Sequence, residues 1–332
     1  MPSVIIGENR VSPPDQVKRP TSSGQVLLFI IILCVIAGGL LAIIAYALAD
    51  PQFEAKEFDR SRQMLIAAKI LSPTGNFEIL EEKAIAAIFD PQTETLVIAK
   101  AGERIPKATD DEIKRIASLR IRPLLTDARG NVFSIGEKKL NLPKYLEEHK
   151  KEGYAVQDLK LFYAILPNDS KSAKITDQDI AKDLGLADAF VVPVSGFGLW
   201  APIYGYIALF PNGNTVIGTT WYEQAETPGL GANISEPWWQ AQFFGKLIFH
   251  ESSDGKTDLS TAPMGIVVVK GKVQDVLSTS PKSKSAVDGI SGATLTGDGV
   301  TQAYRASLTP YREFLIKIHT LKQKKVNDNN SS

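Results

Sequence analysis

Two short segments of this sequence are unusually rich in small residues, and one of them also carries hydroxyl groups in a pattern that could hold a phosphate. The richer segment spans residues 288–297 and reads DGISGATLTG. A helix is predicted directly after it, from about Asp298 to His319, and a helix N-terminus offers free N–H donors and a partial positive charge to an anion. The alternative is a glycine loop in which Ser and Thr only cap the helix. Spacing alone leaves both interpretations open.

This segment matches neither of two common nucleotide-binding motifs. It lacks the lysine of the P-loop, GxxxxGK(S/T), and it does not contain the GxGxxG of a dinucleotide-binding fold. We therefore expect no direct recognition of a nucleoside triphosphate or of NADH by these residues.

The second segment is ETPGLG, from Glu226 to Gly231. Two glycines and a proline favour a sharply folded loop whose backbone can approach another group closely. An ordinary turn is the alternative, and the loop by itself does not identify a ligand.

The elements expected around these segments mix helices with antiparallel strands. Asn-Gly at 212–213 between two β-rich runs predicts a hairpin of Tyr204–Phe210 and Thr215–Trp221. Further strands are predicted at Leu161–Leu166 and Gly265–Val269. Besides the one after residue 297, the predicted helices are Arg62–Leu71, Thr109–Leu119, Asp177–Leu186 and an amphipathic Glu236–Phe249. The fold class is therefore α+β.

Composition excludes several classes of function. The chain has 332 residues with 37 Lys+Arg and 37 Asp+Glu, so it lacks the basic excess of a nucleic-acid-binding protein. Its one cysteine, Cys34, permits no intrachain disulfide and no zinc or iron–sulfur centre built from several cysteines. His149, His250 and His319 lie far apart in sequence. Any redox chemistry would need an organic cofactor.

An uncharged run from Val26 to Leu48 predicts a transmembrane helix. Its 23 residues would span roughly 34 Å, which is enough for a hydrocarbon core of about 30 Å. A cleaved signal peptide is the alternative, but its apolar core would be only about 7–15 residues long. Basic residues occur on both sides of the span, so charge leaves the orientation open.

The predicted organisation has five parts. Residues 1–25 form a short polar tail, 26–48 the membrane helix, and 49–190 the first part of the water-soluble domain, with a variable region at 80–190. Residues 191–320 form its core, and 321–332 a disordered tail.

The 288–297 segment resembles the flavinylation motif Asp-x-x-Ser/Thr-Gly-Ala-Thr of FMN-binding domains in membrane redox complexes. In that family a flavin transferase joins FMN to the hydroxyl of the last threonine through a phosphoester bond. The resemblance places this bond on Thr294. It aligns Asp288, Ser291, Gly292 and Ala293 with the rest of the motif.

Other stretches are similar to one family, the C subunits of the sodium-translocating NADH:quinone oxidoreductases. They are GLW at 198–200, the hairpin around 212–215, YEQAETPGLG at 222–231 and FDRSRQMLIAAKIL at 58–71. The G subunits of Rnf-type complexes share the Ser-Gly-Ala-Thr core and are one alternative. A membrane-anchored binding or scaffold module is the other.

The resemblance implies a covalent FMN that relays electrons from NADH towards ubiquinone in a six-subunit membrane complex that exports sodium. NADH and quinone would bind other subunits. The N-terminus would lie inside the bacterial inner membrane and the large domain on the periplasmic side. The cofactor-binding residues expected are Thr294, Ser291, Gly292, Ala293, Asp288, Leu295, Thr296, Thr227, Gly229, Leu230, Gly231 and Trp200; no catalytic acid, base or metal ligand is expected. Residues 80–190 and the Lys-rich tail depart from the family pattern.

Overall fold

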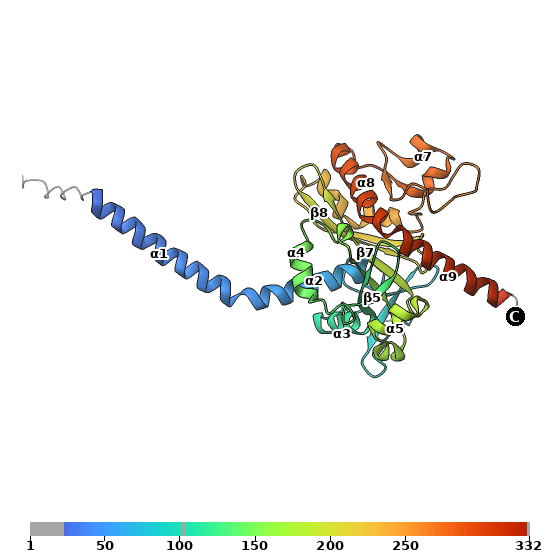
Figure 1. The fold of residues 1–332 in the computed structure, drawn as a ribbon, viewed down its shortest axis with the longest axis horizontal. Coiled ribbons are helices and arrows are strands. Elements are labelled where there is room, and N and C mark those ends of the chain that lie inside the picture. The colour runs from blue at the N-terminus through green and yellow to red at the C-terminus, as the bar shows by residue number, and fades with distance from the viewer. Residues whose placement is uncertain (1–22, 101, 103, 331–332) are drawn as a thin grey trace, which may run out of the picture. The chain divides into compact units, whose positions relative to one another are not determined.

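The computed structural model describes residues 23–100, 102 and 104–330 (Figure 1). The chain divides into two compact units, Met1–Lys56 and Glu57–Ser332. The tail predicted for residues 1–25 lies outside the described residues except for its last three, which belong to the first helix. The predicted class, an apolar N-terminal helix followed by an α+β domain, is confirmed.

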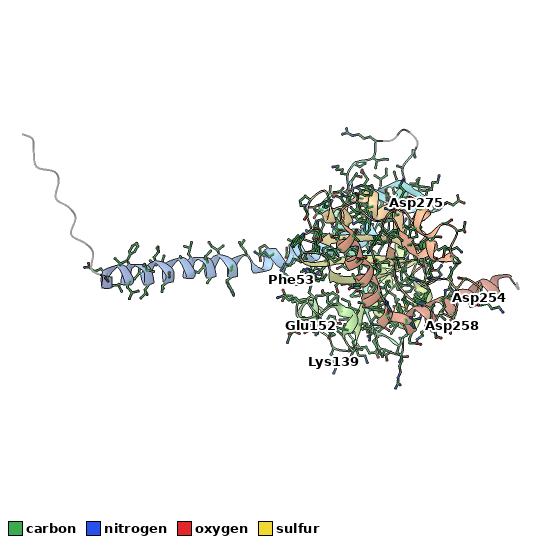
Figure 2. All side chains as sticks on the ribbon, turned by 90° about the horizontal axis from the view of Figure 1, so that it is seen from above. Phe53, Lys139, Glu152, Asp254, Asp258 and Asp275 are labelled. Carbon is green, nitrogen blue, oxygen red and sulfur yellow. The ribbon has the colours of Figure 1, made fainter. Side chains whose placement is uncertain are left out.

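The first unit contains helix α1, Ser23–Ala47. This helix is long and apolar enough to cross a membrane, and its side chains project on all sides of it (Figure 2). A helix satisfies its own backbone hydrogen bonds, as a lipid environment requires. The predicted apolar helix is therefore present.

The second unit contains the sheets and the remaining helices. The helices are α2 Ala49–Ala67, which begins in the first unit, α3 Asp110–Arg120, α4 Leu142–His149, α5 Asp177–Lys182, α6 Pro237–Gln240, α7 Val273–Leu277, α8 Thr294–Leu308 and α9 Arg312–Asn330. The strands are β1 Phe77–Leu80, β2 Ala84–Asp90, β3 Thr95–Ile98, β4 Ile121–Thr126, β5 Val132–Ser134, β6 Lys160–Ile165, β7 Ala189–Phe197, β8 Pro202–Leu209, β9 Val216–Glu223, β10 Val267–Val268 and β11 Ala286–Val287.

One antiparallel sheet of six strands, in the order β5-β4-β6-β7-β8-β9, organises the second unit. Strands from before and after residue 190 share this sheet, so the variable region supplies half of it. The strands β1-β2-β3 form a separate antiparallel sheet, and β10 pairs with β11 in parallel.

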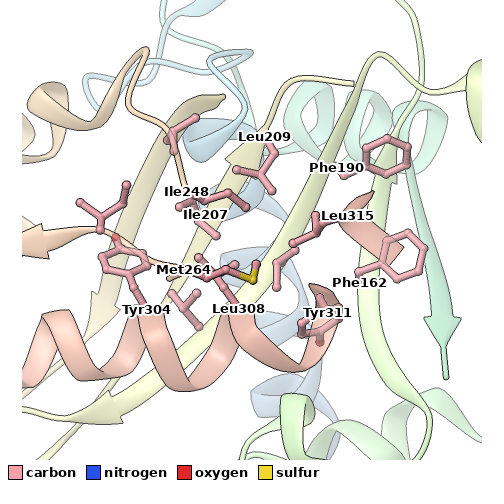
Figure 3. Close-up of a cluster of buried hydrophobic side chains, with 14 of the residues drawn as sticks. Phe162, Phe190, Ile207, Leu209, Ile248, Met264, Tyr304, Leu308, Tyr311 and Leu315 are labelled. Atoms are coloured by element: carbon pink, nitrogen blue, oxygen red, sulfur yellow. The ribbon is translucent and has the colours of Figure 1, made fainter. Parts of the chain in front are cut away.

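The large sheet is buried on both faces because successive side chains along its strands point alternately into two different cores. In β6, Leu161 and Tyr163 pack into the core that contains α2 and α3, whereas Phe162 and Ala164 pack into the core that contains α8 and α9. Figure 3 shows the second core, where side chains of α8 and α9 meet those of β6, β7 and β8. In this core the ring centroids of Phe162 and Phe314 lie 4.3 Å apart.

Helix α3 begins with a complete capping box. Thr109 Oγ1 accepts a hydrogen bond from the Glu112 N–H, and the Glu112 carboxylate accepts one from the Thr109 N–H. We expect Thr109→Ala to lower the free energy of unfolding by about 1 kcal/mol, because N–H groups of the first turn lose their partners. Urea denaturation measures this change.

Ser118→Ala is the matched control on the same helix. The Ser118 hydroxyl donates only to the Arg115 carbonyl within α3, and alanine is the better helix former. This variant should be as stable as the parent protein or more so. An equal loss in both variants would contradict the role assigned to the capping box.

Several predicted elements differ from the structure. The helix predicted over Glu236–Phe249 is wrong: α6 ends at Gln240 and one 3-10 turn follows, Ala241–Phe243. Gly245 then has a φ of 75°, which ends the helical path, and the chain beyond it forms isolated β-bridges. The predicted strand over Gly265–Val269 is shorter, being β10 alone.

The helix predicted from about Asp298 to His319 begins earlier, at Thr294, and is interrupted by a 3-10 turn at Thr309–Tyr311. Pro310 lies in this turn and, having no N–H, cannot continue the hydrogen-bond pattern of an α-helix. The chain resumes as α9, which reaches Asn330 and so covers most of the segment assigned to the tail.

Candidate functional site

The 288–297 segment leads into α8, and α8 packs unusually closely against β7. A Cβ atom on Gly299 would lie 2.3 Å from the Phe197 carbonyl oxygen, and one on Gly196 would lie 2.4 Å from the Ala303 Cβ. Further along α8, the Ser307 hydroxyl accepts a hydrogen bond from the Ser195 N–H at 3.0 Å and donates one to the Ser195 carbonyl at 3.1 Å. These contacts fix the position of α8, and therefore of its N-terminus, on the sheet.

The three hydroxyl groups of the segment differ in accessibility. Thr294 is the first residue of α8 and is exposed, and Ser291 is exposed in the turn before it. Thr296 is 2% exposed and its hydroxyl donates to a carboxylate. Ala293 precedes the helix and supplies no side-chain cap, so the free N–H groups of the first turn remain available to an anion.

Glu226 is the acceptor for Thr296. Its carboxylate accepts hydrogen bonds from Thr296 Oγ1 at 2.6 Å and from the backbone N–H groups of Leu199 and Trp200 at 3.0 Å each. We call these four residues the Glu226 network. The network joins the GLW turn, the ETPGLG loop and the first turn of α8, which the sequence singles out separately.

Two glycines make room for this network. A Cβ on Gly198 would lie 2.4 Å from Glu226 Oε1, and a Cβ on Gly231 would lie 2.5 Å from Thr296 Oγ1 and 2.8 Å from Glu226 Oε2. Gly198 and Gly231 are therefore required by the close approach of the Glu226 carboxylate.

The hydrogen bonds of the network lower the pKa of Glu226. Burial by itself would raise this pKa, but the bonds from Thr296, Trp200 and Leu199 stabilise the charged form and outweigh it. A carboxylate whose pKa is lower in the folded state contributes stability above its unfolded pKa, and this contribution disappears as the pH falls through the folded value.

We expect the stability difference between the parent protein and Glu226→Gln to be constant near neutral pH and to shrink as the pH falls below about 4.3, the ordinary pKa of glutamate, because the unfolded chain then takes up a proton that folded Glu226 resists. Chemical denaturation of both proteins from pH 7 to pH 3 measures this difference. A difference that persists unchanged at pH 3 would contradict an ionised Glu226.

A cavity of about 530 Å³ lies beside the first turn of α8. Thr294 and Ser291 line it, together with Trp238 and two exposed lysines, Lys270 and Lys272. Its volume falls within the usual range for small-molecule sites, about 300–1,000 Å³. Two cations next to free helical N–H groups favour a phosphate here.

Asp288 also lines the cavity, but its polar atoms are used within the protein. Its carboxylate accepts a hydrogen bond from the Val273 N–H at 2.7 Å, at the start of α7. Its carbonyl accepts one from Trp239 Nε1 at 2.9 Å, and its N–H donates to Gln242 Oε1 at 2.9 Å. The structure thus gives Asp288 the role of holding the turn in place.

Apolar side chains are exposed in the Glu226 network and next to it. Trp200 is 65% exposed and Leu295 is 61% exposed, and Leu230 is also exposed. The Trp200 indole N–H donates to Thr227 Oγ1 at 3.2 Å, which orients the ring. A flat apolar group held at Thr294 would find contact area on these side chains.

The ETPGLG loop touches the 288–297 segment directly. The nearest atom to a Cβ built on Gly292 is Leu230 Cδ2, at 2.9 Å. Gly292 and Gly229 both have positive φ, 75° and 76°, so each turn depends on glycine. The structure thus brings together the two segments from which the expected site residues come, with Trp200 beside them.

Sequence reasoning missed Glu226 as a site residue, and with it Lys270, Lys272 and Trp238. The acid that begins ETPGLG was a usable sign, because a carboxylate next to a folded glycine loop can accept several backbone N–H bonds. Nothing in the spacing indicated the lysines, since the turn after β10 brings them to the cavity.

Comparison with known proteins identifies the family. A family model described as FMN-binding domain matches residues 198–309. The chain is 46% identical over 308 residues to the C subunit of the Na(+)-translocating NADH-quinone reductase of Chlamydia pneumoniae, covering 92% of this chain and 96% of that protein. It is 44% identical over 308 residues to the corresponding subunit of Chlamydia caviae, covering 92% and 95%.

Among solved structures, the chain is similar to the crystal structure of Shewanella oneidensis NqrC, with a TM-score of 0.48 and 24% identity over 79% of this chain and 99% of that one. The family assignment follows from the sequence relatives, which match nearly the whole chain at more than 40% identity. This chain therefore belongs to the family of the C subunits of the Na(+)-translocating NADH-quinone reductases and contains its FMN-binding domain.

Proposed function

We propose that this protein carries FMN on Thr294 through a phosphoester bond and relays electrons inside a sodium-translocating NADH:quinone reductase. The observation that carries the proposal is the difference in accessibility between the hydroxyl groups of the motif. Thr294 is exposed at the uncapped N-terminus of α8, whereas the Thr296 hydroxyl is buried and already donates to Glu226. The modification replaces the hydroxyl proton of Thr294 by the phosphorus of FMN, so the product is the sum of protein and FMN less one water.

The residues around Thr294 suit the parts of FMN. The free N–H groups of the first turn and the nearby Lys270 and Lys272 favour its phosphate. The exposed side chains of Trp200, Leu230 and Leu295 offer apolar contact to its ring system. FMN supplies the one- and two-electron chemistry, and the protein supplies placement and electrostatics.

The same proposal assigns α1 as a permanent membrane anchor that keeps the flavin within reach of its redox partners. The N-terminus would lie in the cytoplasm and the large domain on the periplasmic side, as the family resemblance implies. The other subunits of the complex would bind NADH and quinone, and a flavin transferase would attach the FMN. Binding of NADH by another subunit of the complex agrees with the absence of a GxGxxG motif from this sequence.

The test begins with the protein co-expressed with a flavin transferase and run on a denaturing gel. A fluorescent band at the mass of the chain is expected, and a dark band would contradict covalent attachment. The assembled complex is then purified through a tag on this chain. We expect NADH:quinone reductase activity that sodium stimulates; sodium-independent oxidation of ferredoxin would instead indicate an Rnf-type complex.

A further inference from the structure

Glu226 is a buried carboxylate whose charge is balanced by hydrogen bonds alone. The residue is 5% exposed. Among the described ranges 23–100, 102 and 104–330, no Lys, Arg or His forms an ion pair with it. Burying such a charge is costly, so proteins keep one chiefly where the surrounding hydrogen bonds and the function both require it.

The partners of Glu226 are all donors from the flavin-binding region. Two are backbone N–H groups of the GLW turn, which carries the exposed Trp200. The third is the hydroxyl of Thr296, which lies two residues after Thr294 in the first turn of α8. One carboxylate therefore determines how the attachment residue and the aromatic side chain lie relative to each other.

We propose that Glu226 is a positioning residue of the flavin site, and that its negative charge lowers the reduction potential of the flavin on Thr294. The inference rests on the proposed attachment of FMN. Adding electrons to the flavin increases the negative charge near Glu226. A fixed anion close by opposes this increase, and a buried anion does so with little screening by salt.

The network also keeps Thr296 from acting as a second acceptor of the flavin. Its hydroxyl is buried and points to Glu226, so only Thr294 and Ser291 present free hydroxyl groups in the motif. Glu226 thereby contributes to the choice of the modified residue as well as to the placement of the flavin.

The experiment compares the flavinylated full-length protein with Glu226→Gln, which removes the charge, and with Glu226→Asp, which retains it. Glu148→Gln is the control, because Glu148 is an exposed acid on α4 paired with Lys144. Spectroelectrochemical titration is expected to give a more positive midpoint potential for Glu226→Gln. Glu226→Asp should remain close to the parent protein, and Glu148→Gln should equal it.

A second measurement uses the same proteins made without the transferase, so that no flavin is present. Hydrogen exchange at the amides of Leu199 and Trp200, and at that of Gly297, which donates to the Ala293 carbonyl, should be about tenfold faster in Glu226→Gln, as expected from the loss of roughly one net hydrogen bond. If Glu226→Gln does not fold, Thr296→Val takes its place. That variant should increase exchange only in the first turn of α8 and leave the potential near that of the parent protein.

The outcomes separate the proposals. A potential of Glu226→Gln equal to that of the parent protein overturns the electrostatic part, and unchanged exchange overturns the positioning part. Both parts are supported if Glu226→Gln shows faster exchange and a more positive midpoint potential while Glu226→Asp keeps the potential of the parent protein. If the parent protein carries no covalent flavin, the proposed attachment fails, while the exchange experiment still decides the positioning role.

Discussion

Replacing Thr294 with alanine is expected to remove covalently bound flavin completely while leaving the fold intact. The hydroxyl is the only group of this side chain that can form the phosphoester bond. The side chain is exposed at the first position of α8, so its loss removes no packing in the core. In-gel flavin fluorescence measures attachment, and circular dichroism checks the fold. Fluorescence that persists in Thr294→Ala would show that another residue carries the flavin.

Two matched variants test whether another hydroxyl group of the motif carries the flavin. Ser291→Ala removes the second exposed hydroxyl of the motif, and Thr296→Val removes the buried one. Both are expected to remain fluorescent, because each keeps the hydroxyl of Thr294. A dark band for Ser291→Ala alone would move the attachment site into the turn before α8.

The second large effect is expected from Gly299→Ala. The added methyl group would lie 2.3 Å from the Phe197 carbonyl oxygen, which is backbone and cannot turn aside. Helix α8 must then move away from β7, at a cost of about 1–3 kcal/mol in the free energy of unfolding. The movement displaces Thr294 at the start of the helix, so flavin attachment should also decrease. Urea denaturation and in-gel fluorescence measure the two effects.

Gly136→Ala is the control for this variant. Gly136 lies in an exposed turn, a Cβ there would meet no atom within 4 Å, and its φ is not positive. This change should leave stability within about 0.5 kcal/mol of the parent protein. Equal losses in the two variants would show that close packing of α8 on β7 is not the cause.

Local signals in the sequence predicted a good part of this structure. The apolar run marks α1, the Asn-Gly turn marks the hairpin of β8 and β9, and Thr109 marks the start of α3. Each is a pattern in neighbouring residues, for which backbone preferences and hydrophobic periodicity are sufficient evidence.

What failed or was missed depends on contacts between distant residues. Helical spacing at Glu236–Phe249 was overridden because Gly245 turns the chain there and the residues after it form β-bridges. The role of Glu226 depends on Leu199, Trp200 and Thr296, up to 70 positions away, and only the folded chain brings them to one carboxylate. The spacing of these residues in the sequence does not predict that they contact the same carboxylate.

One covalent bond, between Thr294 and FMN, is central to the proposed function, and peptide mass spectrometry of the co-expressed protein tests it most directly. We expect a single peptide whose mass is increased by FMN less one water, with fragmentation placing the addition on Thr294. The same addition on Ser291 or Thr296, or unmodified Thr294 in a preparation where the transferase is active, would contradict it.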